Sequence, residues 1–256
     1  MKNFDTPLDE MLYILSKESE QPVPDNLIDS DKRWLINSLM TIRSPGYLDE
    51  RFLSLQNDLL TRENANFYDC NGVKFRKHFA LTRRDITDLK INAVCCETMD
   101  YLGSMIPNLR CMDNKILLKG GLEIREECNK INQANNFICR VGSAFDLAGY
   151  NLPADRVIKI ILPRVDNMIQ YDVDKIKSGI LSALDFMRDK GIKKFAINLS
   201  IDSGFNIPNE MYINVIVHTI SKYIKDKKYK VDCVLVVDND RDEMTVKDLL
   251  KIKSVF

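Results

Sequence analysis

The sequence predicts an α/β protein, a three-layer α/β/α sandwich around a mixed, mainly parallel sheet, with a helical N-terminal extension. From about residue 74, strand-like segments alternate with amphipathic helical segments, which is typical of a mainly parallel sheet covered by helices. The run Val231–Val237 is apolar almost throughout, as expected of a strand covered on both faces. Residues 1–70 carry helical patterns only. We therefore predict a helical extension at residues 1–72 and the α/β/α domain at residues 73–256.

Three helices are predicted in the extension. The first has apolar residues at helical spacing, namely Leu8, Met11, Leu12 and Leu15. The second begins at Asp29 or Ser30, residue types that cap helix N-termini. The third carries the apolar residues between Phe52 and Leu60. Three helices of this length cannot bury their own apolar faces, so we expect them to dock on the domain that follows.

Six strands and four helices are predicted in the domain. The strands are Lys74–Ala80, Ile91–Cys96, Ile138–Asp146, Val157–Leu162, Phe195–Leu199 and Val231–Val237. The helices lie at about residues 112–132, 173–190, 209–226 and 243–253. Ligands of such sheets bind outside the carboxyl ends of the strands, so we expect the site in the loops that follow them.

Composition excludes several classes of protein. Lys plus Arg and Asp plus Glu both number 37, so the formal net charge is zero and provides no basic field for nucleic acid. No run of about 18 apolar residues predicts a membrane span, and the polar N-terminus does not predict a secretory signal. The seven cysteines are odd in number, which favours reduced thiols in a cytoplasmic protein.

The most specific pattern lies between Gly103 and Cys128. It consists of Pro107, Asn108, Cys111, Asp113, Asn114, Ile116, Gly121, Arg125 and Cys128. With these residues, and with the later stretch Gly149–Pro153, the chain resembles the zinc-containing macrodomains. That branch belongs to the family of ADP-ribose-binding proteins and protein-ADP-ribose hydrolases and carries a similar helical extension. The resemblance implies a macrodomain-like sandwich whose ligand is ADP-ribose or a related adenine nucleotide.

The resemblance suggests two ligand-binding turns. The first is Asp85, Ile86 and Thr87, which match the family's Asp-Ile-Thr. There the carboxylate accepts a hydrogen bond from the exocyclic amine of adenine. The second is Ser203, Gly204 and Phe205, within a glycine-containing loop before a helix, whose amides would face the diphosphate. Both triplets are also ordinary turn residues.

The chain departs from the family where metal and substrate are held. The two asparagines of the family's loop after the strand at Ile91–Cys96 are absent. Ser104 and Leu109 stand where two of the three zinc ligands should be, so that only Cys111 remains. Zinc needs three protein ligands in a catalytic site, so we expect neither metal nor cofactor. We interpret Asp113 and Asn114 as a helix cap, and Lys159 stands where the family has a histidine.

These departures favour a degenerate macrodomain that lacks zinc. It would act as a module that binds ADP-ribose or an adenine nucleotide, or as a protein-interaction module, and would not be an enzyme. The alternative is an active ADP-ribosyl hydrolase with a rewired, zinc-independent site. Its acid and base would come from Glu97, Asp100 or Asp202, and Cys111 would be the nucleophile. A structural subunit of a larger complex is a third class.

Overall fold

The predicted three-layer sandwich is present. The computed structural model describes residues 4–19, 22–24, 26–29, 31–33, 35–36, 50–63, 66–103, 111–165, 170–227 and 229–250. Its main sheet has six strands in the order β2-β8-β7-β4-β6-β5. They are β2 (Phe79–Thr82), β4 (Ala93–Thr98), β5 (Ala144–Ala148), β6 (Arg156–Ile161), β7 (Lys194–Asn198) and β8 (Asp232–Val236). Only β5 runs antiparallel to its neighbour, which confirms a mixed, mainly parallel sheet.

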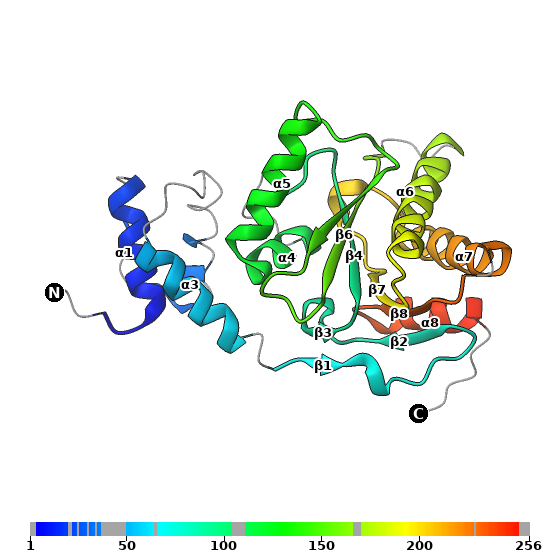
Figure 1. Ribbon diagram of the computed structural model, residues 1–256, viewed down its shortest axis with the longest axis horizontal. Helices are drawn as coiled ribbons and strands as arrows, with labels where there is room; N and C mark the ends of the chain where they lie inside the picture. The colour runs from blue at the N-terminus through cyan, green and yellow to red at the C-terminus, as the bar shows by residue number, and fades with distance from the viewer. Residues whose placement is uncertain are drawn as a thin grey trace.

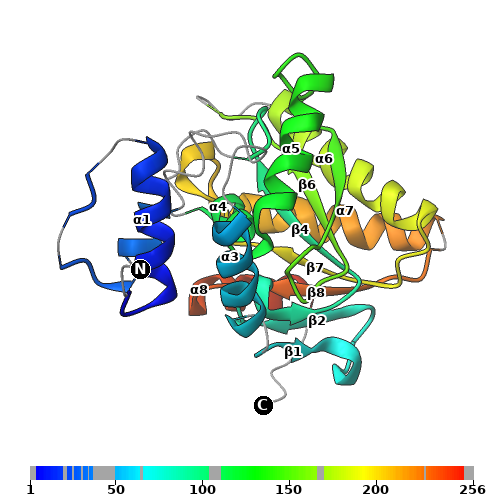
Figure 2. The same ribbon diagram turned by 60° about the vertical axis from the view of Figure 1, so that its left-hand side comes forward.

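In the described part of the chain, five helices cover the two faces of this sheet. They are α4 (Met112–Gly120), α5 (Leu122–Ala134), α6 (Gln170–Asp189), α7 (Asn209–Lys227) and α8 (Asp240–Leu250). Helices α4 and α5 lie on one side, and α6 and α7 on the other (Figures 1 and 2). Successive β4 side chains enter different cores: Cys95 packs with the α6 and α7 residues, whereas Val94 and Cys96 pack with those of α4 and α5. This alternation produces the three layers.

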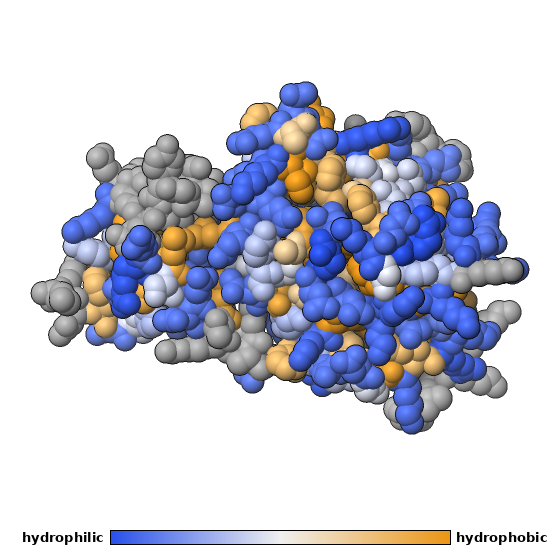
Figure 3. Space-filling model, in the orientation of Figure 1, coloured by the Kyte–Doolittle hydropathy of each residue, from blue (hydrophilic) through white to orange (hydrophobic). Residues whose placement is uncertain are grey.

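The N-terminal helices dock on the sandwich, as expected. Helices α1 (Pro7–Ser19) and α3 (Glu50–Glu63) share a buried cluster with Leu122 at the start of α5. Its buried members are Leu8, Met11, Leu12, Leu15, Ile36, Phe52, Leu55 and Leu122. Apolar surface reaches this junction in Figure 3. Residues 31–33 and 35–36 are helical, but most of the predicted second helix, including Trp34, lies outside the described residues. The boundary at residue 72 stays a prediction.

Local backbone geometry shifts two predicted strands. The strand predicted from Lys74 begins only at Phe79, because Lys77 and His78 have φ of 50° and 73° and form a turn. The strand predicted from Ile138 begins at Ala144. Ile138 itself is 70% exposed and follows a turn.

Gly121 divides the helix predicted at 112–132. Its φ of 94° ends α4 and begins α5, a conformation that favours glycine.

A small parallel sheet of β1 (Tyr68–Asp69) and β3 (Leu89–Lys90) was not predicted. No helix among the described residues is long and apolar enough to cross a membrane.

Candidate functional site

Buried polar side chains gather near the carboxyl ends of β4, β6 and β7. They are Glu97, Thr98, Lys159 and Asn198, each 2% exposed or less. The first turn of α4 adds Asp113, which is 5% exposed. Ionisable groups almost never lie this deep unless they are paired. This edge of the sheet is where the fold class predicts a ligand site.

A buried ion pair joins β6 to α4. The ammonium of Lys159 donates to Asp113 Oδ1, and Thr98 Oγ1 donates to Asp113 Oδ2 at 2.9 Å. Burial lowers the pKa of Lys159. Sequence reasoning did not identify this pair. The available signal was a lysine inside an otherwise apolar predicted strand, which requires an anionic partner if it is buried.

Cys111 caps α4. Its Sγ accepts a hydrogen bond from the amide of Asn114 at 3.4 Å, so the expectation that Asp113 and Asn114 form the cap is wrong. Burial raises the pKa of the Cys111 thiol, although the Asn114 amide partly offsets this effect. A protonated thiol is a weak nucleophile and a weak metal ligand. Ser104 and Leu109 lie outside the described residues. Within the described residues, no group of three or more His, Cys, Asp or Glu side chains is placed to hold a metal ion.

Glu97 is the least satisfied polar group at this edge. Its Oε1 accepts from Asn198 Nδ2 at 3.2 Å, and its Oε2 has no hydrogen-bond partner among the described residues. Burial raises the pKa of Glu97 to about 8, and Asp202 and Asp238 act in the same direction. Glu97 is therefore a neutral carboxylic acid below that pH.

The turn predicted to read adenine is a short 3-10 helix, η3 (Ile86–Asp88), with Asp85 as its cap. Asp85 Oδ1 accepts from Thr87 N at 3.0 Å and from Thr87 Oγ1 at 2.7 Å. Asp85 Oδ2 lies 2.7 Å from Lys115 Nζ in α4. Although burial raises the pKa of Asp85, these donors outweigh it and the pKa is lowered. Ile86 and Thr87 are buried, so Asp85 is the side chain of this triplet that can meet a ligand.

The second predicted turn forms the 3-10 helix η4 (Ser203–Phe205), capped by Asp202. The amide of Gly204 donates to Asp202 Oδ1 at 2.7 Å, and the amide of Phe205 to the Asp202 carbonyl at 3.1 Å. Two of the amides predicted to face a diphosphate are thus bonded within the turn. Phe205 is 4% exposed and packs in the core.

The loops after β4 and β7 meet at this turn. A Cβ at Gly204 would lie 3.3 Å from Met99 Cε. The η3 turn follows β2, which β8 separates from β7 in the sheet. The ligand-binding roles of both turns stay predictions.

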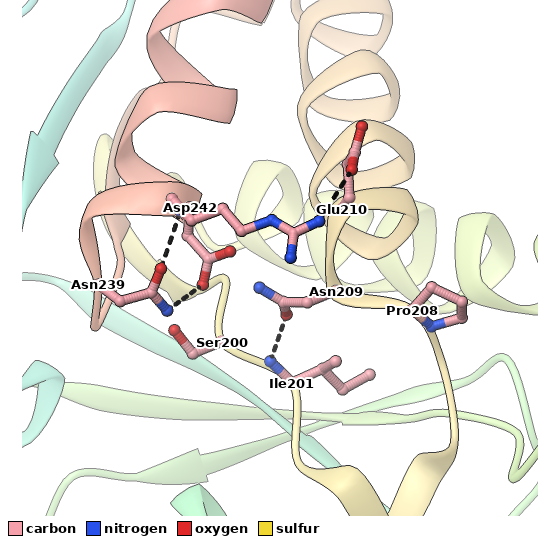
Figure 4. Close-up of a pocket in the computed structure, with 8 residues that line it drawn as sticks. Ser200, Ile201, Pro208, Asn209, Glu210, Asn239 and Asp242 are labelled. Atoms are coloured by element: carbon pink, nitrogen blue, oxygen red, sulfur yellow. Dashed lines mark hydrogen bonds and ion pairs between the residues drawn. The ribbon is translucent and has the colours of Figure 1, made fainter.

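A cavity of about 520 Å³ opens beside Ser200, between the starts of α7 and α8 (Figure 4). Asn239 Nδ2 donates to Asp242 Oδ2 at 2.7 Å, and the Ile201 amide to Asn209 Oδ1 at 2.9 Å. The lining of this cavity includes none of the side chains that the sequence predicted as ligand-binding.

Comparison with known proteins agrees with the fold. Residues 103–211 match the family model of the Macro domain. The chain has the macrodomain fold. It is 26% identical over 223 residues to the protein-ADP-ribose hydrolase of Staphylococcus aureus, covering 84% of each chain.

Two solved macrodomains share the fold. The Oceanobacillus iheyensis macrodomain with ADP has a TM-score of 0.59 and 19% identity, covering 68% of this chain and 90% of that one. The Trypanosoma brucei macrodomain in complex with ADP has a TM-score of 0.62 and 14% identity, covering 85% and 96%.

Proposed function

We propose that this macrodomain binds ADP-ribose or a related adenine nucleotide without zinc, and acts as a binding or protein-interaction module. The observation that carries the binding part is the state of Asp85. Its carboxylate is ionised, held in place by Thr87 and still 25% exposed. A fixed carboxylate of this kind suits a hydrogen bond from a base amine. Two macrodomains of the same fold were solved with ADP, which supports the proposal.

We infer that zinc-dependent hydrolysis is absent, because the side chains around α4 that could bind zinc already make other interactions. Cys111 serves as a helix cap, and its thiol has a raised pKa. Asp113 neutralises Lys159. A zinc site needs several thiolates or imidazoles that converge on one point, and neither residue is free to supply such a ligand.

The direct test is calorimetric titration of the purified protein with ADP-ribose, with zinc content measured on the same sample. We expect a complex in the micromolar range and no stoichiometric zinc. A parallel assay of ADP-ribose release from a modified protein should show no turnover. The S. aureus hydrolase, assayed alongside, is the positive control. Release at a comparable rate, or one zinc per chain, would reject the proposal.

Asp85→Asn should weaken ADP-ribose binding by roughly ten- to a hundredfold, because a hydrogen bond to a charged group contributes about 1.5–3 kcal/mol. The asparagine keeps an oxygen for the Thr87 amide, so the turn itself should persist. Asp69→Asn is the matched control. Asp69 caps a 3-10 turn (Cys70–Gly72) in the same way, with the Asn71 amide 2.8 Å from its Oδ1. Equal affinities of both variants in calorimetry would remove Asp85 from the site.

The second candidate function is a zinc-independent hydrolase. The observation that favours it is Glu97, a neutral acid with an oxygen that has no partner among the described residues, and whose pKa Asp202 helps to raise. In that reaction Cys111 would be the nucleophile, but its raised thiol pKa opposes this role.

Cys111→Ser separates the two functions. Serine removes the thiol and still offers an oxygen to the Asn114 amide, so the cap of α4 is kept. We expect ADP-ribose affinity to stay within about twofold of the parent value, since a capping change of this kind leaves the site in place. Turnover that is present in the parent and lost in this variant would favour the hydrolase.

A further inference from the structure

Lys115 contacts the Asp85 carboxylate, which we propose binds the base of the nucleotide. Its side chain projects from the first half of α4, and its Nζ lies 2.7 Å from Asp85 Oδ2. The other oxygen of Asp85 already accepts two hydrogen bonds from Thr87. The Lys115 side chain is 52% exposed and that of Asp85 25%. The pair is thus open to solvent at the edge where a ligand would arrive.

The ion pair changes the chemistry that this edge offers. A lone carboxylate only accepts hydrogen bonds, so it selects a base with an amine and repels a carbonyl oxygen. An ammonium has three N–H donors, and one of those of Lys115 points to Asp85. Lys115 therefore brings N–H donors close to Asp85 Oδ2, which is an acceptor. Together the two side chains can meet an edge that carries an acceptor next to a donor.

We propose that Lys115 determines base selectivity at this site, so that the macrodomain accepts purine nucleotides with a 6-oxo group as well as those with a 6-amino group. This inference rests on the proposed function. In a 6-oxopurine, the oxygen at C6 accepts from Lys115 while the neighbouring N1–H donates to Asp85. In a 6-aminopurine, the amine donates to Asp85 and a ring nitrogen accepts from Lys115.

A second ion pair also joins α4 to the turn. One helical turn later, the ammonium of Lys119 contacts Asp88 at the end of the same 3-10 helix. Lys119 is 24% exposed and Asp88 38%. Lys119 contacts a different carboxylate of the same turn, so it serves as a matched control for any effect that Lys115 has through the packing of α4.

The test compares the dissociation constants of ADP and inosine diphosphate by calorimetry. In the parent protein we expect the two constants to lie within about threefold of each other, because the exposed pair can serve either base. Lys115→Met should weaken inosine diphosphate more than ADP, because the 6-oxo group would then face the Asp85 carboxylate without a donor. The ratio of the two constants should change by at least tenfold in favour of ADP, roughly the effect of one hydrogen bond to a charged group. Lys115→Arg keeps donors beside Asp85 and should retain the parent ratio, and Lys119→Met should leave it unchanged.

The ratio of the ADP and inosine diphosphate dissociation constants distinguishes an effect on selectivity from an effect on stability or on general affinity. A change in stability or in general affinity moves both constants together, and a thermal melt of each variant checks that it is folded. If the parent binds ADP and Lys115→Met leaves the ratio unchanged, Lys115 has no role in selectivity while the proposed function stands. If the parent binds neither nucleotide at millimolar concentration, both the proposed function and this inference are wrong. A tenfold change that also occurs in Lys119→Met would likewise overturn the inference.

Discussion

Lys159→Met is expected to lower the free energy of unfolding by about 3–5 kcal/mol, the usual result of removing one partner from a buried ion pair. Lys159 is completely buried, and Asp113 is 5% exposed. Without the ammonium, the Asp113 carboxylate would keep one described side-chain donor, the Thr98 hydroxyl at 2.9 Å. It would then have to take up a proton or open the packing of α4 against β6. Urea unfolding at pH 7 measures the loss.

A double variant identifies the cause. Replacing the pair by apolar residues, with Lys159→Met and Asp113→Leu together, leaves no unpaired charge and should recover most of the lost stability. Lys130→Met is the surface control. It removes an ion pair to Glu126 whose side chains are 71% and 52% exposed, and it should cost less than about 1 kcal/mol. If the double variant is no more stable than Lys159→Met, the loss comes from packing and not from the stranded carboxylate.

This pair also shows where sequence reasoning on the site stopped. The strand around Lys159 and the helix beginning near Asp113 were both predicted, and both were correct within a few residues. What joins them is a contact between residues 46 apart in the sequence, which hydrophobic periodicity does not encode. A lysine among apolar residues indicates that an acid must lie nearby, but the chain has many acids. The fold decides which one.

The fold itself was predictable because each strand and helix carries its own periodicity. The errors fall where single residues adopt unusual backbone conformations. His78, with φ of 73°, delays β2, and Gly121, with φ of 94°, divides one predicted helix into two. A left-handed histidine leaves no sequence pattern. The Gly120-Gly121 pair did offer a signal for the break, because glycine commonly follows the end of a helix.

Glu97→Gln is expected to stabilise the protein at alkaline pH and to have little effect at acidic pH. Burial raises the pKa of Glu97 in the folded state from its ordinary value of 4.5 to about 8. Below pH 4.5 both folded and unfolded states hold the proton. As the pH rises from 4.5 to 8, the unfolded chain loses that proton first, so the folded state becomes progressively less stable. Each pKa unit corresponds to about 1.4 kcal/mol, so the cost reaches at most on the order of 5 kcal/mol above pH 8.

Glutamine has the shape of the protonated acid and cannot ionise, so the variant should escape this loss. The measurement is chemical unfolding of parent and variant at pH 4.5, 6, 7.5 and 9, plotted as the difference between the two. The thiols that ionise at high pH are common to both proteins and cancel in that difference. Glu126→Gln, on the exposed surface of α5, should give a difference that is small and flat with pH. A flat curve for Glu97→Gln as well would show that Glu97 is ionised in the folded protein. In that case Glu97, at the end of β4, would be a charged carboxylate able to accept a hydrogen bond from a ligand, and not a neutral acid.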